Sequence, residues 1–261
     1  MPQTTALLTV MIAAVRKAAR ALARDFGEVE NLQVSRKGPG DFVTNADKRS
    51  EKILFDELSR ARPGYGFLME ERGEVPGTDK TNRFIVDPLD GTTNFMHGNP
   101  HFCISVALER EKELVAGVVY DVIKDELFWA EKGQGAYLND KRLRVSGRAN
   151  LADSAIAVAL PHQGRANDEK LIKEIQRMAP LVAAMRSTGS AALDLAYVAA
   201  GRFDGYWDRA LKFWDIAGGA VIVREAGGFA REPDGKDFTD TGAVLAANDK
   251  LFAQMMAVLK N

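Results

Sequence analysis

Cysteine, histidine and long hydrophobic runs are scarce in this chain of 261 residues. The single cysteine, Cys103, excludes a disulfide within the chain and a metal site built from several thiolates. The histidines are His97, His101 and His162, too few to favour a site made of imidazoles alone. A metal bound by this protein would therefore be held mainly by carboxylate oxygens.

An excess of charge of either sign is missing as well. Lys and Arg total 35 against 36 Asp and Glu, so the formal net charge is −1. This balance argues against a polybasic nucleic-acid or membrane binder, and against an acidic disordered tail, as the main role. Hydrophobic residues make up 46% and charged residues 27%, the composition of an ordinary globular protein.

No segment approaches the about 20 consecutive apolar residues that a membrane-spanning helix needs. The apolar run 7–15 leads into several Arg and Lys residues, a pattern that also occurs in transit peptides. The helical spacing of its apolar residues favours a first amphipathic helix instead. These residues are Leu8, Ile12, Val15, Ala19, Leu22 and Phe26. We therefore expect a cytoplasmic protein.

Helical and strand patterns alternate along the chain without an internal repeat or a long linker. A second helix is expected near Thr44, where Thr44 or Asn45 can cap it. The first half then predicts an antiparallel sheet from strands at 84–86, 101–108, 114–120, 126–130, 135–138 and 141–145. The second half predicts strands at 155–160, 183–187, 205–207 and 244–247, and helices at 169–178, 190–200, 215–226 and from 249. We expect a mixed α/β layered protein, a single domain over 1–261 with halves at about 1–145 and 146–261.

The most informative segment, residues 84–95, reads Phe-Ile-Val-Asp-Pro-Leu-Asp-Gly-Thr-Thr-Asn-Phe. Pro88 disfavours the α conformation at Asp87, which is therefore expected at the end of an apolar strand. Asp90 lies across a tight turn, so both carboxylates can face one point. The Leu89 carbonyl between them adds a third hard oxygen, and such a donor set suits Mg²⁺.

The residues after this turn predict an anion site beside the cation. Gly91 has no side chain where a substrate must approach the backbone. If Gly91 and Thr92 open a helix, their N–H groups can bind an anion. No Lys or Arg occurs between Arg83 and Arg110, so the carboxylates there lack a local basic partner. Asp-Pro and Asp-Gly alone are ordinary turn chemistry, but the whole run is more specific and indicates a phosphate site.

The run from Asp87 to Phe95 resembles the signature of the inositol monophosphatase family, which comprises Mg²⁺-dependent, lithium-sensitive phosphatases. Two further segments resemble family elements in order and spacing over nearly the full chain. They are Trp214-Asp215-Ile216-Ala217-Gly218, and Lys37-Gly38 with Asp41, Val43-Thr44 and Ala46-Asp47. The resemblance implies a five-layer αβαβα sandwich, commonly a homodimer.

The resemblance also implies roles for individual residues. The implied metal ligands, for two or three Mg²⁺ ions, are Glu70, Asp87, the Leu89 carbonyl, Asp90 and Asp215. The implied catalytic residues, which orient or activate the attacking water, are Glu70, Thr92 and Asp47. The implied substrate-binding residues are Asp90, Gly91, Thr92, Gly189, Ser190, Ala191 and Asp208. Water would attack the phosphate directly, without a covalent enzyme intermediate.

Two positions depart from the family pattern. Met69 stands before the paired glutamates where the family usually has glycine, which puts the local turn geometry in question. Asp208 stands where inositol phosphatases often have a glutamate, so the substrate preference can differ. Arg186 fits the family pattern. Simpler roles remain open from the residues alone, because Asp215 and Ser190 can be helix caps and Glu70 can lie in a solvated loop.

Several functions stay open at this point. The leading hypothesis is a phosphomonoesterase acting on myo-inositol 1-phosphate or a related polyol or sugar phosphate. Fructose-1,6-bisphosphatase, histidinol phosphatase and bisphosphate nucleotidase are alternatives within the superfamily, although Thr93-Asn94-Phe95 resembles the inositol branch more. A regulatory or RNA-associated protein that keeps the fold and works by binding a partner is the other class. The sequence has no basic stripe for RNA, and every expected ligand is intact.

Overall fold

The computed structural model describes residues 4–28, 34–38, 41–162, 168–238 and 241–260, with side chains omitted at 34–38, 41–43 and 168. The helices are α1 (Ala6–Gly27), α2 (Asn45–Ala61), α3 (Thr92–Met96), α4 (Asp168–Met178), α5 (Ala191–Ala199), α6 (Phe213–Glu225) and α7 (Asp249–Lys260), with 3₁₀ helices η2 (Leu151–Asp153) and η3 (Ala179–Leu181). The strands of the first half are β1 (Val34–Gly38), β2 (Asp41–Thr44), β3 (Gly66–Met69), β4 (Gly73–Val75), β5 (Asn82–Asp90), β6 (Cys103–Arg110), β7 (Glu113–Asp121), β8 (Glu126–Glu131), β9 (Gly135–Leu138) and β10 (Lys141–Arg142). The remaining strands are β11 (Ala155–Val158), β12 (Ala184–Arg186), β13 (Gly205–Asp208), β14 (Phe229–Arg231) and β15 (Val244–Ala247).

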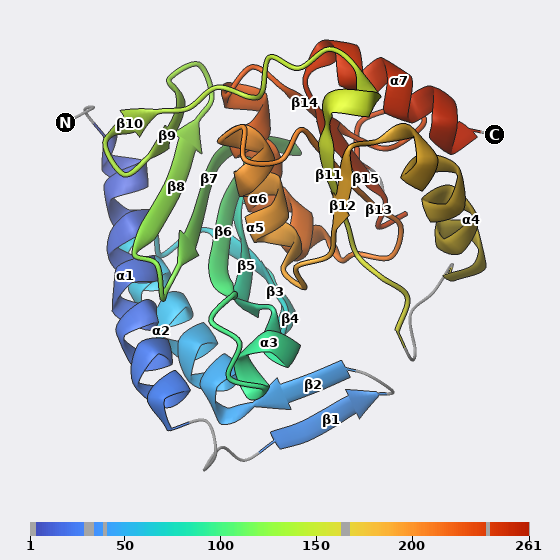
Figure 1. Ribbon diagram of the computed structural model, residues 1–261. Coiled ribbons are helices and arrows are strands. Elements are labelled where there is room, and N and C mark those ends of the chain that lie inside the picture. The colour runs from blue at the N-terminus through green and yellow to red at the C-terminus, as the bar shows by residue number, and fades with distance from the viewer. Residues whose placement is uncertain (1–3, 29–33, 39–40, 163–167, 239–240, 261) are drawn as a thin grey trace.

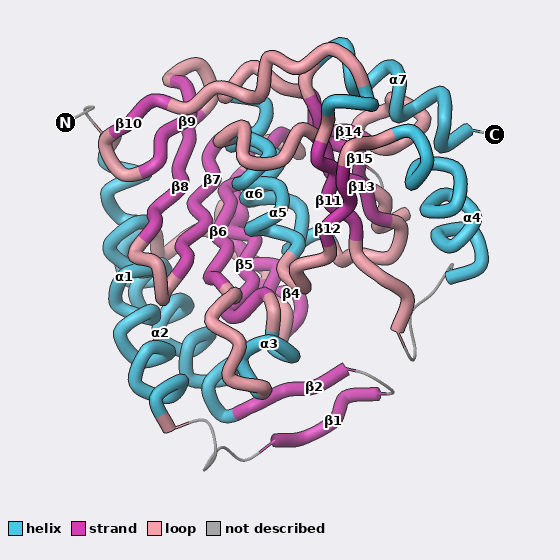
Figure 2. The backbone as a smooth tube through the Cα atoms, viewed as in Figure 1, coloured by secondary structure: helices cyan, strands magenta, loops and turns pink. Residues whose placement is uncertain are grey.

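The strands form two main sheets and a hairpin. Within the described ranges, one sheet has eight strands in the order β10-β9-β8-β7-β6-β5-β3-β4, and the other has five in the order β12-β11-β13-β15-β14. The hairpin is β1-β2. Neighbours from β5 to β10 pair antiparallel, as the sequence predicts, whereas β3 runs parallel to β5. Figure 2 shows the two sheets as separate groups of strands with helices α5 and α6 between them.

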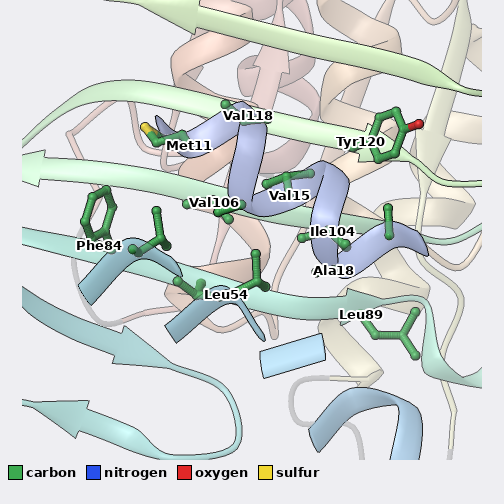
Figure 3. Packing of buried hydrophobic residues seen from close by; sticks show 14 of the residues in the cluster. Met11, Val15, Ala18, Leu54, Phe84, Leu89, Ile104, Val106, Val118 and Tyr120 are labelled. Atoms are coloured by element: carbon green, nitrogen blue, oxygen red, sulfur yellow. The ribbon is translucent and has the colours of Figure 1, made fainter. Parts of the chain in front are cut away.

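Helices and sheets alternate in layers. Helices α1 and α2 cover one face of the eight-stranded sheet, where Met11, Val15 and Leu54 pack on Phe84 and Val106 (Figure 3). A second core joins α5 and α6 to both sheets, and a third packs α4 and α7 on the outer face of the five-stranded sheet. The resulting order is the expected αβαβα sandwich (Figure 1). No helix of the described chain has the length and hydropathy to span a membrane.

The N-terminal helices follow local signals. The Thr5 hydroxyl accepts a hydrogen bond from the Leu8 N–H at the start of α1, and the apolar positions expected from the spacing face the core. Thr44 caps α2, as predicted, and forms a capping box with Asp47. The capping box holds Asp47 in the first turn of α2, in a fixed orientation.

Some predicted element ends are wrong. Strand β5 continues to Asp90, but its pairing with β6 is irregular between Asp87 and Asp90. Pro88 lies in this interval and has no N–H to donate, which explains the break. The strand expected at 141–145 ends at Arg142. Further along, the Val145 N–H donates to the Ala226 carbonyl at the end of α6 and not to a strand partner.

Helix α6 lies close to the eight-stranded sheet because both surfaces carry glycine. A Cβ at Gly117 of β7 would lie 2.4 Å from the Gly218 carbonyl, and a Cβ at Gly218 would lie 2.5 Å from the Ser105 Oγ. Any side chain at either position would therefore separate the helix from the sheet. This close approach brings the first turn of α6, with Asp215, against the face of β5 and β6.

Candidate active site

Glu70 and Asp87 lie side by side because β3 and β5 are parallel. Met69 is the partner of Val86 in the strand register, so the next residues, Glu70 and Asp87, follow at the same edge of the sheet. The Glu70 N–H donates to the Val86 carbonyl, at an N···O distance of 3.3 Å. Met69 itself is fully buried in the core under α1 and α2, so the departure from glycine fills a core position.

The irregular segment from Asp87 to Asp90 brings two carboxylates to the side of the sheet that faces α6. Asp87 is 2% exposed, and its Oδ1 accepts a hydrogen bond of 3.0 Å from the Leu89 N–H. Asp215 approaches from the first turn of α6, where its Oδ2 accepts a hydrogen bond of 2.8 Å from the Lys212 N–H. Asp215 is thus part of a helix cap as well as a member of this acidic group.

The acidic group, defined here as Glu70, Asp87, Asp90 and Asp215, is gathered closely enough to perturb its own ionisation. Burial raises the pKa of Asp87 well above its usual value, and the charges of the other three raise it further. Burial and the charge of Asp90 likewise raise the pKa of Asp215 well above its usual value. Carboxyl groups gathered this closely provide the negative charge that a divalent cation neutralises.

The donor chemistry of the acidic group fits Mg²⁺, which prefers oxygen ligands. Among the described side chains, however, no three His, Cys, Asp or Glu residues are arranged so that they could hold a metal ion as they stand. The fit is therefore one of charge and donor type. The individual ligand assignments remain predictions.

Asp47 and Thr92 meet, as the resemblance implies. The Thr92 Oγ1 lies 3.1 Å from the Asp47 Oδ1 and also 3.1 Å from the Leu89 carbonyl oxygen. Because a hydroxyl carries one proton, it can donate to only one of these acceptors at a time, and the other lone pairs remain available. Asp47 is fully buried, and burial raises its pKa although hydrogen bonds from Thr44 oppose the rise.

Gly91 opens α3, as predicted, and its conformation explains the residue type. Its φ of 95° is left-handed, and a Cβ there would lie 3.1 Å from the His101 carbonyl oxygen and 3.3 Å from that of Gly189. The structure therefore gives a packing reason for glycine here, besides the expected approach of a substrate. His101 packs edge-on against Tyr197, and His97 is exposed.

The substrate-binding residues expected at 189–191 lie at the start of α5, next to Asp90. The Ser190 Oγ donates to the Asp90 Oδ2 at 2.6 Å, and the Ala192 N–H donates to the same oxygen at 2.7 Å. Burial raises the pKa of Asp90, and these hydrogen bonds counteract the rise. The contact joins residues 100 positions apart, and sequence reasoning did not find it.

Asp208 lies in a different environment from the one expected of a residue that binds substrate hydroxyls. It is fully buried on β13, where it accepts hydrogen bonds from the Tyr206 hydroxyl at 3.0 Å and the Arg209 N–H at 2.6 Å. A role in substrate binding stays a prediction. Arg186 is exposed at the end of β12. The side chains of Lys37, Asp41 and Val43 lie outside the described part of the structure.

Two further residues of the site were missed. Asn94 donates from Nδ2 to the carbonyl oxygens of His101 and Thr188, both at 2.8 Å, and so ties α3 to the loop before α5. Asp194 is buried on α5 beside Thr188, and burial raises its pKa to about 8. Asn94 lies within the signature segment, which was a usable signal, whereas Asp194 had none.

A centre rich in carboxylate oxygens and backed by backbone N–H donors is typical of phosphatases that work with divalent cations. More specifically, the chain belongs to the inositol monophosphatase family, whose model matches residues 3–261. The inositol-1-monophosphatase of Mesorhizobium japonicum is 54% identical over 98% of this chain and 97% of its own length. The Nus factor SuhB of Escherichia coli K12 is 39% identical over 98% of this chain and 96% of its own length. The solved inositol monophosphatase of Anabaena superposes with a TM-score of 0.85 at 32% identity, covering 97% of this chain and 95% of that one.

Proposed function

We propose that this protein hydrolyses myo-inositol 1-phosphate, or a closely related polyol or sugar phosphate, to the free alcohol and inorganic phosphate. The observation that carries the proposal is the acidic group at the end of β5, where the charges of Glu70, Asp90 and Asp215 add to burial in raising the pKa of Asp87. The similarity to proteins named inositol-1-monophosphatase, at 54% and 52% identity, supports the choice of substrate. The proteins named Nus factor SuhB are more distant, at 39% to 40% identity, and do not favour the regulatory alternative.

The residues that would hold two or three Mg²⁺ ions are Glu70, Asp87, the Leu89 carbonyl, Asp90 and Asp215. When bound, Mg²⁺ would supply Lewis-acid stabilisation of the phosphate oxygens and lower the pKa of the attacking water. Leu89 is suited to this role because its carbonyl oxygen already lies 3.1 Å from the Thr92 hydroxyl, on the same side as the predicted catalytic pair.

The side chains of this protein contribute proton handling and orientation. The Thr92 hydroxyl, held by Asp47, can accept a hydrogen bond from a water and pass its own proton to the Asp47 carboxylate. Glu70 lies at the same edge of the sheet and is the second acceptor of a proton from the water. The N–H groups of Gly91 and Thr92 at the start of α3 donate to phosphate oxygens as charge develops.

Phosphate release tests the proposal. Wild-type protein stripped of metal is assayed with and without Mg²⁺ on inositol 1-phosphate, fructose 1,6-bisphosphate, histidinol phosphate and a 3′,5′-bisphosphorylated nucleotide. We expect Mg²⁺-dependent activity that is highest on inositol 1-phosphate. Equal activity without Mg²⁺ would refute the metal role. A clear preference for another ester would make that ester the substrate in place of inositol 1-phosphate. For the variant Asp90→Asn, discussed below, the matched control is Asp153→Asn, because Asp153 is an exposed acid remote from β5 in the chain.

The remaining family expectations are part of the same proposal. We infer a single phosphatase domain with halves at about 1–145 and 146–261, a homodimer, inhibition by lithium and a cytoplasmic location. Size-exclusion chromatography with light scattering measures the mass in solution against 28.5 kDa for one chain. Titration of the Mg²⁺-dependent activity with lithium chloride, with sodium chloride at equal ionic strength as the control, tests the inhibition.

A further inference from the structure

The Asp90 carboxylate has two oxygens with different surroundings. Its Oδ2 accepts hydrogen bonds from the Ser190 Oγ at 2.6 Å and the Ala192 N–H at 2.7 Å. The Cys103 Sγ is a third, weaker donor, 3.7 Å from the same oxygen. This set of donors occupies Oδ2 and holds the plane of the carboxylate. Because these donors all converge on Oδ2 within the described part of the chain, we take Oδ1 as the oxygen that binds a ligand.

Ser190 occupies the N-cap position of α5 but does not cap the helix. Its backbone is extended, with φ −143° and ψ 106°, and its side chain makes no capping hydrogen bond. The Ala192 N–H, which a capping side chain would normally satisfy, donates to Asp90 instead. Asp90 therefore caps α5 from another layer of the fold, and Ser190 uses its hydroxyl to orient that cap.

The junction between Asp90 and α5 is also held by contacts that do not involve Ser190. Asn94 bonds to the Thr188 carbonyl in the loop before α5, and a Cβ at Gly189 would lie 2.9 Å from the Asn94 Nδ2. A Cβ at Gly91 would similarly lie 3.3 Å from the Gly189 carbonyl. Because these contacts involve protein groups alone, Ser190 is brought to Asp90 before any substrate is present.

We propose that Ser190 is a positioning residue for the metal centre, which fixes Asp90 through its Oδ2 and thereby directs Oδ1 at Mg²⁺. The inference rests on the proposed metal role of Asp90 and assigns Ser190 a role other than contact with a substrate hydroxyl. Ser190 is 2% exposed, and its hydroxyl proton is already donated to Asp90. The Ser190 hydroxyl therefore has no proton to donate to a sugar hydroxyl. Partners of this kind that orient a ligand are worth about 10- to 100-fold in metal affinity.

Calorimetric titration with Mg²⁺ alone, without substrate, tests this role directly. We expect Ser190→Ala to bind Mg²⁺ about 10- to 100-fold more weakly than wild type. Ser190→Thr, which keeps the hydroxyl, recovers most of the affinity. The matched control is Ser154→Ala, because Ser154 is also a buried serine and its Oγ donates to the Asn150 carbonyl, outside the acidic group. Its Mg²⁺ affinity should equal that of wild type.

Steady-state kinetics on two esters separates the two roles of Ser190. Inositol 1-phosphate carries ring hydroxyls, and p-nitrophenyl phosphate carries none. If Ser190 acts through Asp90, Ser190→Ala loses activity equally on both esters, and higher Mg²⁺ restores kcat. A loss confined to the KM for inositol 1-phosphate, with unchanged Mg²⁺ binding, would overturn the inference and leave the proposed function intact. Wild type that bound no Mg²⁺ would instead overturn the metal role of Asp90, and the inference with it.

Discussion

Two regions of this protein stabilise buried acids in opposite ways. Glu174 on α4 is fully buried. The side chain of Arg209, just after β13, pairs with it at 2.6 Å, and the Trp207 Nε1 donates to it at 3.2 Å. Asp87, Asp90 and Asp215 accept hydrogen bonds from backbone N–H groups and a serine hydroxyl. Glu174 has an internal cation, whereas the acidic group repels itself.

The difference separates an acid that serves the fold from acids that serve a ligand. An ion pair with matched partners loses stability when either partner is removed, because the other charge stays buried. In a group of carboxyls that repel one another, neutralising one of them should leave the free energy of unfolding nearly unchanged or raise it. Substitutions at the two places should therefore have opposite effects on folding and on activity.

The largest effect is expected for Asp90→Asn. Loss of this carboxylate removes a proposed metal ligand, and metal assistance is worth several kcal/mol, so kcat/KM should fall about 1,000-fold. The free energy of unfolding of the metal-free protein should stay the same or rise, because one repulsive charge is gone. Phosphate release and urea unfolding measure the two quantities. A loss of several kcal/mol of stability without metal would show that Asp90 is mainly a structural cap.

Glu174→Gln should give the reverse pattern. Arg209, whose side chain is 11% exposed, would keep its charge without the carboxylate, at a cost of about 3 kcal/mol in the free energy of unfolding. Mg²⁺ affinity and kcat should match wild type. Glu169→Gln, on the exposed side of the same helix, is the control and should change neither quantity. Activity that fell with the Glu174 variant, in protein still folded, would contradict the separation.

Much of the acidic site was predictable because its signals are local. The Asp-Pro-Leu-Asp-Gly-Thr run, the Thr44 cap and the start of α3 at Thr92 each depend on neighbours within a few residues. The approach of α5 to Asp90 depends on the packing of two sheets and could not be read from spacing. The full burial of Asp208 was hidden for the same reason, because a strand sequence does not say which layer covers it.

The next prediction concerns the pH dependence of stability that arises from the buried Asp194. The pKa of Asp194 is raised to about 8, so in the folded protein this group keeps its proton over a range in which the unfolded chain has lost it. A raised pKa contributes stability at low pH that is lost as pH rises toward about 8. Metal-free wild type should lose about 1.4 kcal/mol per pH unit from this group, and Asp194→Asn should flatten that slope. Urea unfolding at pH values from about 4 to about 8.5 measures this slope, because the range spans the pKa of Asp194 in the unfolded and in the folded chain. An unchanged slope in the variant would assign the dependence to other groups.

The smallest effect is expected for Cys103→Ala. The thiol is fully buried and lies 3.7 Å from both the Asp90 Oδ2 and the Ser190 Oγ, but a thiol is a weak donor. Its removal should change Mg²⁺ affinity by less than about threefold, far below the effect of Ser190→Ala, since the two strong donors to Oδ2 remain. Calorimetry on both variants gives the ratio. A tenfold loss for Cys103→Ala would mean that the packing around Asp90, more than the two short hydrogen bonds, determines how this carboxylate is held.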